Sequence, residues 1–126
     1  AGMTSRKTRH RDMTPLEYAR AYLDSRLEDL RQRAASIDLS RRHRANRLSA
    51  NPEDQASERE NEEVLERLAA TTRAEIWQAR HALDRVETGT YGFCERCKRI
   101  IPAERLRAVP EATLCSACAA ADSLAA

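Results

Sequence analysis

Glycine, proline and aromatic residues are scarce in this chain of 126 residues. Three glycines and four prolines are too few for the many turns of an all-β protein. Aromatic residues make up only 4% of the chain and charged residues 33%, which excludes a wide aromatic core around a deep substrate pocket. Long apolar runs are also missing, since none approaches the roughly 18 residues that a membrane-spanning helix needs.

The common catalytic motifs are absent from the sequence as well. There is no glycine-rich phosphate-binding loop and no HExxH motif, and the three histidines, His10, His43 and His81, have no evident nucleophile or metal partner. We expect His43 and His81 to be exposed on helices. The basic start of the chain is not followed by an apolar segment, so it does not have the pattern of a secretory signal. These features predict a cytoplasmic protein that is not an enzyme.

The charges nearly balance, with a net charge of +2, which does not by itself indicate nucleic-acid binding. Their distribution is uneven, because an arginine-rich block at residues 41–47 is followed by an acidic block at residues 53–66. Blocks of opposite charge close in sequence suggest two segments that fold back on each other. Exposed pairs of this kind contribute little to stability.

Two long stretches contain neither glycine nor proline. Leu16–Asn51 and Glu53–Thr88 are equal in length and are separated only by Pro52. This arrangement is typical of a helical hairpin. We therefore predict a mostly α-helical chain: a flexible basic tail at residues 1–13, an antiparallel coiled-coil hairpin at 14–88 with its tip near 50–57, and a small C-terminal module with a short helix at 89–126. A parallel dimer of long helices is the alternative, which Pro52 disfavours.

The sequence marks the start of the first predicted helix and the end of the second. Thr14, Pro15 and Glu17 form a capping box, in which Thr14 and Glu17 each accept a hydrogen bond from the other's backbone N–H group. Gly89 is predicted to end the second helix, because glycine adopts the left-handed conformation found after helix ends.

Apolar residues recur on one face of each predicted helix. The first helix carries Leu16, Leu23, Leu27, Leu30, Ala34, Ile37 and Leu48. The second helix carries Leu65, Leu68, Thr72, Ile76, Ala79, Leu83 and Val86. This spacing predicts a narrow coiled-coil contact rather than a broad core face. Trp77, next to Ile76, is predicted to pack at the base of the hairpin.

The four cysteines form two CxxC pairs, Cys94 with Cys97 and Cys115 with Cys118, and 17 residues separate the pairs. This spacing can present four thiolates to one zinc ion in a tetrahedral arrangement. Such a site is closed and stabilises a fold. A thiol redox switch is the alternative for cysteine pairs of this type. We predict one zinc ion per chain, with all four cysteines as ligands.

A long hairpin followed directly by Gly-Thr-Tyr-Gly-Phe-Cys-Glu-Arg-Cys and a second CxxC pair resembles the DksA/TraR family of bacterial transcription regulators. The resemblance extends from about Thr14 to Cys118. It implies a regulator, active in the stringent response, whose hairpin enters the secondary channel of RNA polymerase and which does not bind specific DNA. It also implies a monomer.

The resemblance further implies a functional hairpin tip. The family motif of two aspartates and an alanine corresponds to Asn51, Asp54 and Ala56, so an asparagine replaces the first aspartate. A structural role is the alternative, because asparagine and aspartate also favour helix N-termini. A second capping box begins at Ser57, so the helix could start there and leave Asp54 on the loop.

The family's basic positions for binding guanosine tetraphosphate correspond here to Gln78, Val109 and Ala119. None of these side chains carries a positive charge for the phosphates. We therefore expect an effect on transcription with little dependence on this nucleotide. Two other functions remain as alternatives: a zinc-ribbon protein that binds nucleic acid, recognised by steeply salt-dependent binding to free DNA, and a CxxC thiol redox sensor.

Overall fold

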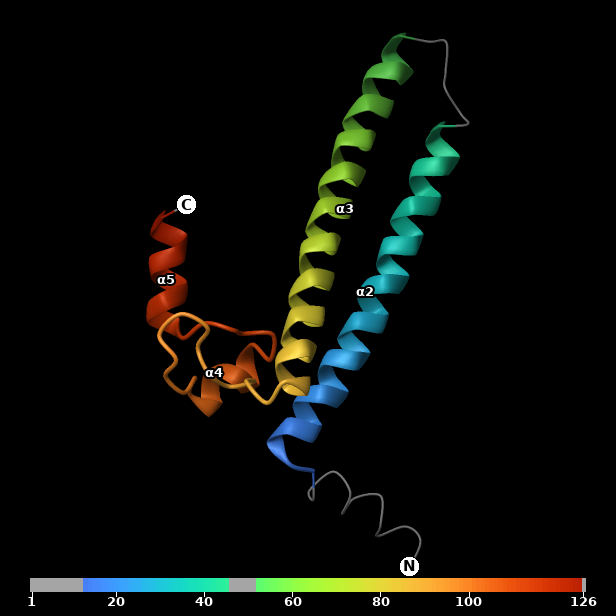
Figure 1. Cartoon of the computed structure of the whole chain (residues 1–126). Helices are drawn as coiled ribbons and strands as arrows, with labels where there is room; N and C mark the ends of the chain where they lie inside the picture. Colours follow the sequence, from blue (N-terminus) through green and yellow to red (C-terminus); the bar gives the residue numbers. More distant parts are fainter. Residues whose placement is uncertain (1–12, 46–51, 126) are drawn as a thin grey trace, which may run out of the picture. The chain divides into compact units, whose positions relative to one another are not determined.

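The computed structural model describes residues 13–45 and 52–125, and helices dominate this part of the chain (Figure 1). The four helices of the described ranges are α2 (Pro15–Ala45), α3 (Pro52–Glu87), α4 (Ala103–Ala108) and α5 (Ser116–Ala125). The long helices α2 and α3 lie antiparallel, side by side. The predicted fold class, a mostly α-helical chain with a helical hairpin and a four-cysteine module, is confirmed. None of the described helices is both long and apolar enough to cross a membrane.

The described residues form two compact units. One unit consists of residues 26–45 and 52–78, the part of the hairpin away from its base, which we call the middle unit because it lies in the middle of the sequence. The other consists of residues 13–25 and 79–125, which are the base of the hairpin and the C-terminal module. Residues 1–12 of the predicted N-terminal tail and residues 50–51 of the predicted tip (50–57) lie outside the described residues.

The N-terminus of α2 has the predicted capping box. The backbone N–H group of Glu17 donates to Thr14 Oγ1 at 3.2 Å, and the backbone N–H group of Thr14 donates to Glu17 Oε2 at 3.2 Å. The two hydrogen bonds satisfy N–H groups that a helix end leaves without partners. The prediction that α2 begins at this motif is confirmed.

The C-terminus of α3 is formed around Gly89, which has a φ of +74°. The backbone N–H group of Thr90 donates to Arg85 O at 2.9 Å, and that of Gly89 donates to Val86 O at 3.3 Å. This pair of bonds is the Schellman motif, in which a left-handed residue reverses the chain after the last helical turn. The predicted end of the second helix is confirmed.

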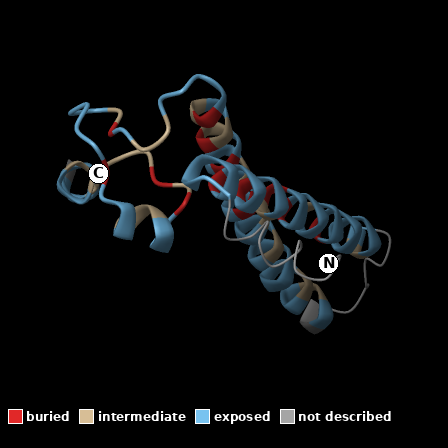
Figure 2. Cartoon of the chain, turned by 90° about the horizontal axis from the view of Figure 1, so that it is seen from below, coloured by how far each residue is buried: buried red, intermediate tan, exposed pale blue. Residues whose placement is uncertain are grey.

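The buried apolar residues are mainly leucine and isoleucine on α2 and alanine and valine on α3, and Figure 2 shows buried segments on the paired helices. In the unit at the base of the hairpin, Leu23 and Ala82 are fully buried and pack with Val86. In the middle unit, Leu30 is 1% exposed and Ile37 is 9% exposed. Full burial of one leucine side chain contributes about 2 kcal/mol, so a few such residues provide much of the helix pairing.

The apolar contact is narrower than the sequence pattern suggested. Leu16 and Leu68 belong to the predicted rows but are 47% and 48% exposed. Thr72 is almost fully buried, and its hydroxyl donates to Leu68 O at 2.7 Å, which satisfies the polar atom inside the contact. Leu48 lies outside the described residues.

The prediction that Trp77 packs at the base of the hairpin is wrong. Its side chain is 64% exposed. Ile76, its neighbour in sequence, is half-buried, and a turn of 100° per residue carries Trp77 away from the contact between the helices. His43 is exposed on α2, as predicted.

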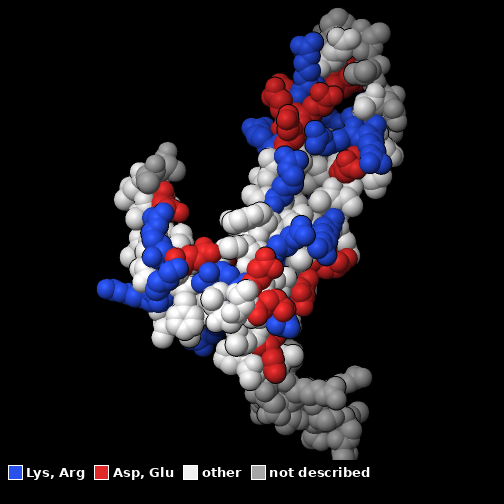
Figure 3. All heavy atoms as spheres, viewed as in Figure 1, with Lys and Arg blue, Asp and Glu red and all other residues white. Residues whose placement is uncertain are grey.

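Ion pairs connect α2 and α3 in the middle unit. Glu75 Oε2 lies 3.6 Å from Arg26 Nη2 and 3.3 Å from Arg33 Nη1. Arg42, from the arginine-rich block, pairs instead with Asp38 on its own helix at 3.0 Å. Acidic and basic side chains alternate along the hairpin surface in Figure 3. Because these side chains are between about one third and three quarters exposed, solvent screens the pairs and each contributes little to stability.

Candidate metal centre

The first cysteine pair lies on a short backbone hairpin, residues 92–101, which we call the first knuckle. Phe93 and Ile100 form an isolated antiparallel β-bridge in it. The backbone N–H group of Cys94 donates to Arg99 O at 2.8 Å, and that of Ile101 donates to Gly92 O at 2.7 Å. Gly92 has a φ of +90°, a value that residues with a side chain rarely adopt.

The turn of the first knuckle contains an unusual residue. Lys98 has a φ of +65°. Among the described residues other than glycine, no other residue has a left-handed backbone. Its backbone N–H group donates to Cys94 O at 3.0 Å, and its Nζ atom donates to Glu95 O at 2.9 Å. These bonds close the turn between Cys94 and Cys97.

The second cysteine pair lies at the start of α5. Cys115 directly precedes the helix, and its carbonyl accepts a hydrogen bond from the N–H group of Ala119 at 2.9 Å. Cys118 therefore lies in the first helical turn. The segment between the pairs forms the short helix α4 and returns to the first knuckle, where the N–H group of Glu95 donates to Thr113 O at 2.9 Å.

The ligand atoms of the four cysteines come together. Their sulfur atoms all lie within 4.8 Å of one another, and those of Cys97 and Cys115 are 3.8 Å apart. Cys94 is fully buried, whereas Cys97 is exposed. The four cysteines are thus positioned to bind one metal ion, as their spacing in the sequence predicts.

The electrostatics of the cluster suit a cation. The backbone N–H group of Cys97 hydrogen-bonds the Cys94 sulfur and lowers the pKa of that thiol to about 6, although burial opposes this effect. The hydrogen bond with Cys115 raises the pKa of Cys118 to about 12, and burial adds to the effect. Four sulfurs this close need a positive charge before all can lose their protons. Zinc supplies that charge and accepts four thiolates in a closed tetrahedral site.

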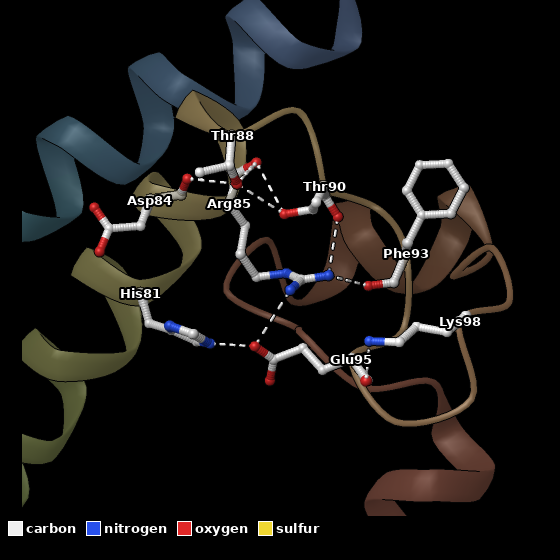
Figure 4. A network of polar contacts seen from close by, with 8 residues as sticks. All are labelled: His81, Asp84, Arg85, Thr88, Thr90, Phe93, Glu95 and Lys98. Atoms are coloured by element: carbon white, nitrogen blue, oxygen red, sulfur yellow. Dashed lines mark hydrogen bonds and ion pairs between the residues drawn. The ribbon is translucent and has the colours of Figure 1, made fainter.

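A group of charged side chains connects α3 to the first knuckle (Figure 4). Arg85 donates from Nη2 to Phe93 O at 2.6 Å and to Thr90 O at 2.9 Å, and its Nη1 donates to Glu95 Oε1 at 3.3 Å. His81 Nε2 contacts the same oxygen of Glu95. Arg85, Glu95 and His81 therefore hold the backbone on both sides of Cys94.

The prediction that His81 is simply an exposed helix residue is wrong, since its side chain is only 30% exposed and contacts Glu95. The spacing of His81 and Arg85, four residues apart on one helix face, could have indicated a shared carboxylate. Burial would raise the pKa of Glu95, but the hydrogen bonds from His81 and Thr113 and the charges of His81 and Arg85 outweigh it. The pKa of Glu95 is therefore lower than usual.

The predicted tip residues are only partly described. Asn51 lies outside the described residues, whereas Asp54 and Ala56 are exposed near the N-terminus of α3. Because α3 begins at Pro52, Asp54 belongs to the first helical turn. The alternative start at Ser57, with Asp54 on a loop, is wrong.

The three positions that correspond to the family's nucleotide-binding residues differ in exposure. Gln78 is exposed on α3, Val109 is 42% exposed after α4, and Ala119 is half-buried on α5.

Two family models match the chain. The prokaryotic dksA/traR C4-type zinc finger matches residues 89–123, and the N-terminal domain of DnaK suppressor protein-like proteins matches residues 19–86. The first covers the four cysteines, and the second covers most of the helical hairpin. The prediction of a zinc centre is confirmed by the family match together with the sulfur geometry.

Solved structures share the fold over most of the chain. The structure of transcription factor DksA2 from Pseudomonas aeruginosa is 26% identical, has a TM-score of 0.78, and covers 89% of this chain and 85% of that chain. The solution structure of DnaK suppressor protein from Agrobacterium tumefaciens C58 is 34% identical, has a TM-score of 0.58, and covers 87% and 96% of the two chains.

Two curated relatives match over shorter lengths. A protein of Aquifex aeolicus (strain VF5) is 43% identical over 58 residues, which are 46% of this chain and 40% of that protein. YteA of Bacillus subtilis (strain 168) is 42% identical over 62 residues, 49% of this chain and 26% of that protein. The chain therefore spans less than half the length of either relative.

Proposed function

The chain belongs to the DksA/TraR family of prokaryotic zinc-finger proteins, and on this basis we propose that it regulates transcription by binding RNA polymerase and is not an enzyme. The observation that carries the proposal is the combination of a long helical hairpin with a four-sulfur cluster in one chain. A similar solved structure is that of a transcription factor, DksA2. We further propose a monomer that acts in the cytoplasm.

The length of the hairpin supports insertion into a channel. The 36 residues of α3 extend about 54 Å at 1.5 Å per residue. A paired helix of this length can carry a few polar side chains deep into the secondary channel of the polymerase. Asn51, Asp54 and Ala56 are the proposed tip residues, and the carboxylate of Asp54 is proposed to change the stability of the promoter complex.

The base of the hairpin is the proposed anchor. Cys94, Cys97, Cys115 and Cys118 are the proposed zinc ligands, and zinc stabilises a module that has few buried side chains of its own. Arg85 and Glu95 connect this module to α3, so the module and the helix end form one support. We also propose that the effect depends little on guanosine tetraphosphate, since Gln78, Val109 and Ala119 provide no cation.

Two measurements with purified RNA polymerase test the proposal. Binding of the zinc-loaded protein to the core enzyme is measured first, and the lifetime of a preformed promoter complex is measured second. We expect saturable binding and a changed lifetime, with and without guanosine tetraphosphate. Absence of binding to the polymerase, together with steeply salt-dependent binding to free DNA, would instead favour the zinc-ribbon alternative.

A further inference from the structure

Two large apolar side chains are exposed together on the first knuckle. Phe93 is 44% exposed and Ile100 is 73% exposed. Because they are partners in an antiparallel β-bridge, their side chains lie on the same face of the backbone hairpin. The ring of Phe93 points away from the polar contacts of Arg85 and Glu95 (Figure 4). Phe93 and Ile100, paired in one β-bridge, thus form an apolar pair that is exposed to solvent.

Positive charge borders this apolar pair. Lys98 and Arg99 precede Ile100 directly, and both are exposed. Within the described ranges, no hydrogen bond or ion pair engages the guanidinium of Arg99. Two carboxylates of the C-terminal module already have partners, since Glu95 contacts His81 and Arg85, and Asp122 pairs with Arg96. Basic side chains accordingly predominate over the C-terminal module in Figure 3.

The backbone of Lys98 adds an independent observation. A left-handed conformation costs a residue with a side chain about 1 kcal/mol or more relative to glycine. Glycine would fit the turn without this cost, yet the position holds a lysine with a φ of +65°. The lysine places a cation two residues before Ile100 at this turn.

We propose that Phe93, Lys98, Arg99 and Ile100 form a protein-docking surface, which we call the knuckle face. The partner surface has an apolar socket for Ile100 and Phe93, bordered by carboxylates that pair with Arg99 and Lys98. Resting on the proposed function, the partner is an acidic surface of RNA polymerase. The more exposed of the two apolar side chains is Ile100, and an aliphatic side chain offers no ring for base stacking, which favours a protein over a nucleic acid.

Titration of purified core RNA polymerase with the zinc-loaded protein tests the knuckle face. Ile100→Asp places a carboxylate in the apolar socket, and we expect its dissociation constant to rise about tenfold or more. Arg99→Ala is expected to weaken binding about threefold, with a smaller dependence on salt. Ala120→Asp is the matched control, because it adds the same charge at an exposed position of α5. Its affinity should stay within about twofold of the original protein.

Two further readouts separate docking from folding. Zinc content and thermal unfolding of Ile100→Asp should match those of the original protein, since Ile100 is exposed. Lys98→Gly removes the backbone strain but also the hydrogen bond from Nζ to Glu95 O, so its unfolding temperature should change little, and it should bind polymerase about threefold more weakly. Affinity then falls without a matching loss of stability, which a purely structural role of Lys98 does not produce.

The possible failures are distinguishable. If the original protein binds polymerase and Ile100→Asp binds equally well, the knuckle face is not a docking surface, although the proposed function stands. If the original protein does not bind polymerase, the proposed function and this inference both fail. A single-stranded oligonucleotide that binds the original protein but not Arg99→Ala, with polymerase binding unchanged, would make the knuckle face a nucleic-acid surface and overturn the inference.

Discussion

The guanidinium of Arg85 on α3 lies 3.3 Å from the carboxylate of Glu95, which is the residue directly after the first cysteine. The same guanidinium donates to the carbonyls of Thr90 and Phe93. One side chain therefore fixes the backbone on both sides of Cys94 from the last turns of α3. The metal centre and the helix end share this support, so a change in one should be measurable in the other.

Replacing Arg85 by alanine should weaken both the fold and the metal centre. Arg85 is only 15% exposed, and its loss removes the donor to Phe93 O and one of the donors to Thr90 O and to the Glu95 carboxylate. A polar group that loses its hydrogen-bond donor inside the fold costs about 1–3 kcal/mol, so we expect the free energy of unfolding to fall by about 2 kcal/mol. Zinc should also be lost to a chelator at lower concentration. Arg80→Ala, at an exposed position of α3, is the control and should change neither measurement.

Replacing Cys118 by serine should remove the zinc. A hydroxyl is a poor zinc ligand, and the module has little apolar core to hold its shape without the metal. We expect elemental analysis to give one zinc per chain for the original protein and well below one for the variant. Ser116→Ala, in the same helical turn, should keep its zinc. A metal-free protein that is fully folded and forms disulfides reversibly would favour the redox alternative.

The two leucines Leu30 and Leu39 of α2 should differ sharply in their contribution to stability. Leu30 is 1% exposed and Leu39 is 56% exposed. Truncation of a buried leucine to alanine costs about 2–5 kcal/mol, because it removes apolar contacts and leaves a cavity. Leu39→Ala should cost less than about 0.5 kcal/mol. Urea unfolding followed by circular dichroism measures both values, and equal losses would contradict the packing.

Alkaline pH should destabilise the base of the hairpin through Tyr91. Burial raises the pKa of this phenol above its ordinary value of 10.0, and the negative charge of Glu111 adds to the effect. A group whose pKa is higher in the folded chain stabilises the fold fully below its unfolded pKa, and this contribution is lost as the pH rises through the folded pKa.

The Tyr91→Phe variant isolates this contribution. It loses the hydrogen bond from the hydroxyl to Pro110 O at 2.9 Å, so it should be about 1 kcal/mol less stable at neutral pH. The difference between the two proteins should shrink as the pH rises from about 8 to about 11. Chemical unfolding across this range provides the measurement. A difference that is independent of pH would show that the phenol titrates alike in the folded and unfolded chains.

Replacing Asp54 by asparagine should separate binding from activity. Asparagine keeps the size of the side chain and also favours a helix N-terminus, so α3 should remain intact. We expect the affinity for polymerase to change by less than about threefold, whereas the effect on promoter-complex lifetime should fall about tenfold. Asn51→Asp should strengthen that effect. An unchanged effect in Asp54→Asn would assign Asp54 a structural role only.

Features encoded by neighbouring residues could be predicted from the sequence. The capping box of Thr14 and Glu17 lies within four residues, and the turn at Gly89 needs only one residue that tolerates positive φ. The cysteine spacing also predicted that the four sulfur atoms come together, since the 17 residues between the two CxxC pairs are enough for the chain to turn back once. In each of these cases the local sequence determines the geometry.

Features that depend on packing between distant residues could not be predicted. Trp77 is next to the apolar row of α3, but only the actual position of α2 decides which flank of the row is covered. The contact of His81 with Glu95 requires the first knuckle to return to α3. The helix α4, which lies between Pro102 and Pro110, has only six residues, so its apolar pattern is too short to indicate a helix.

The burial of Leu23 has a consequence for the order of events during synthesis. Its partners in the core, Ala82 and Val86, follow far later in the chain, after both long helices have nearly been completed. While the ribosome makes residues 26–78, the leucine at the base has no apolar surface to cover it. The middle of the hairpin can pair first, and the base closes only when the end of α3 has emerged. Nascent chains stalled before Ala82 should therefore expose this leucine, and chains released after Cys118 should not.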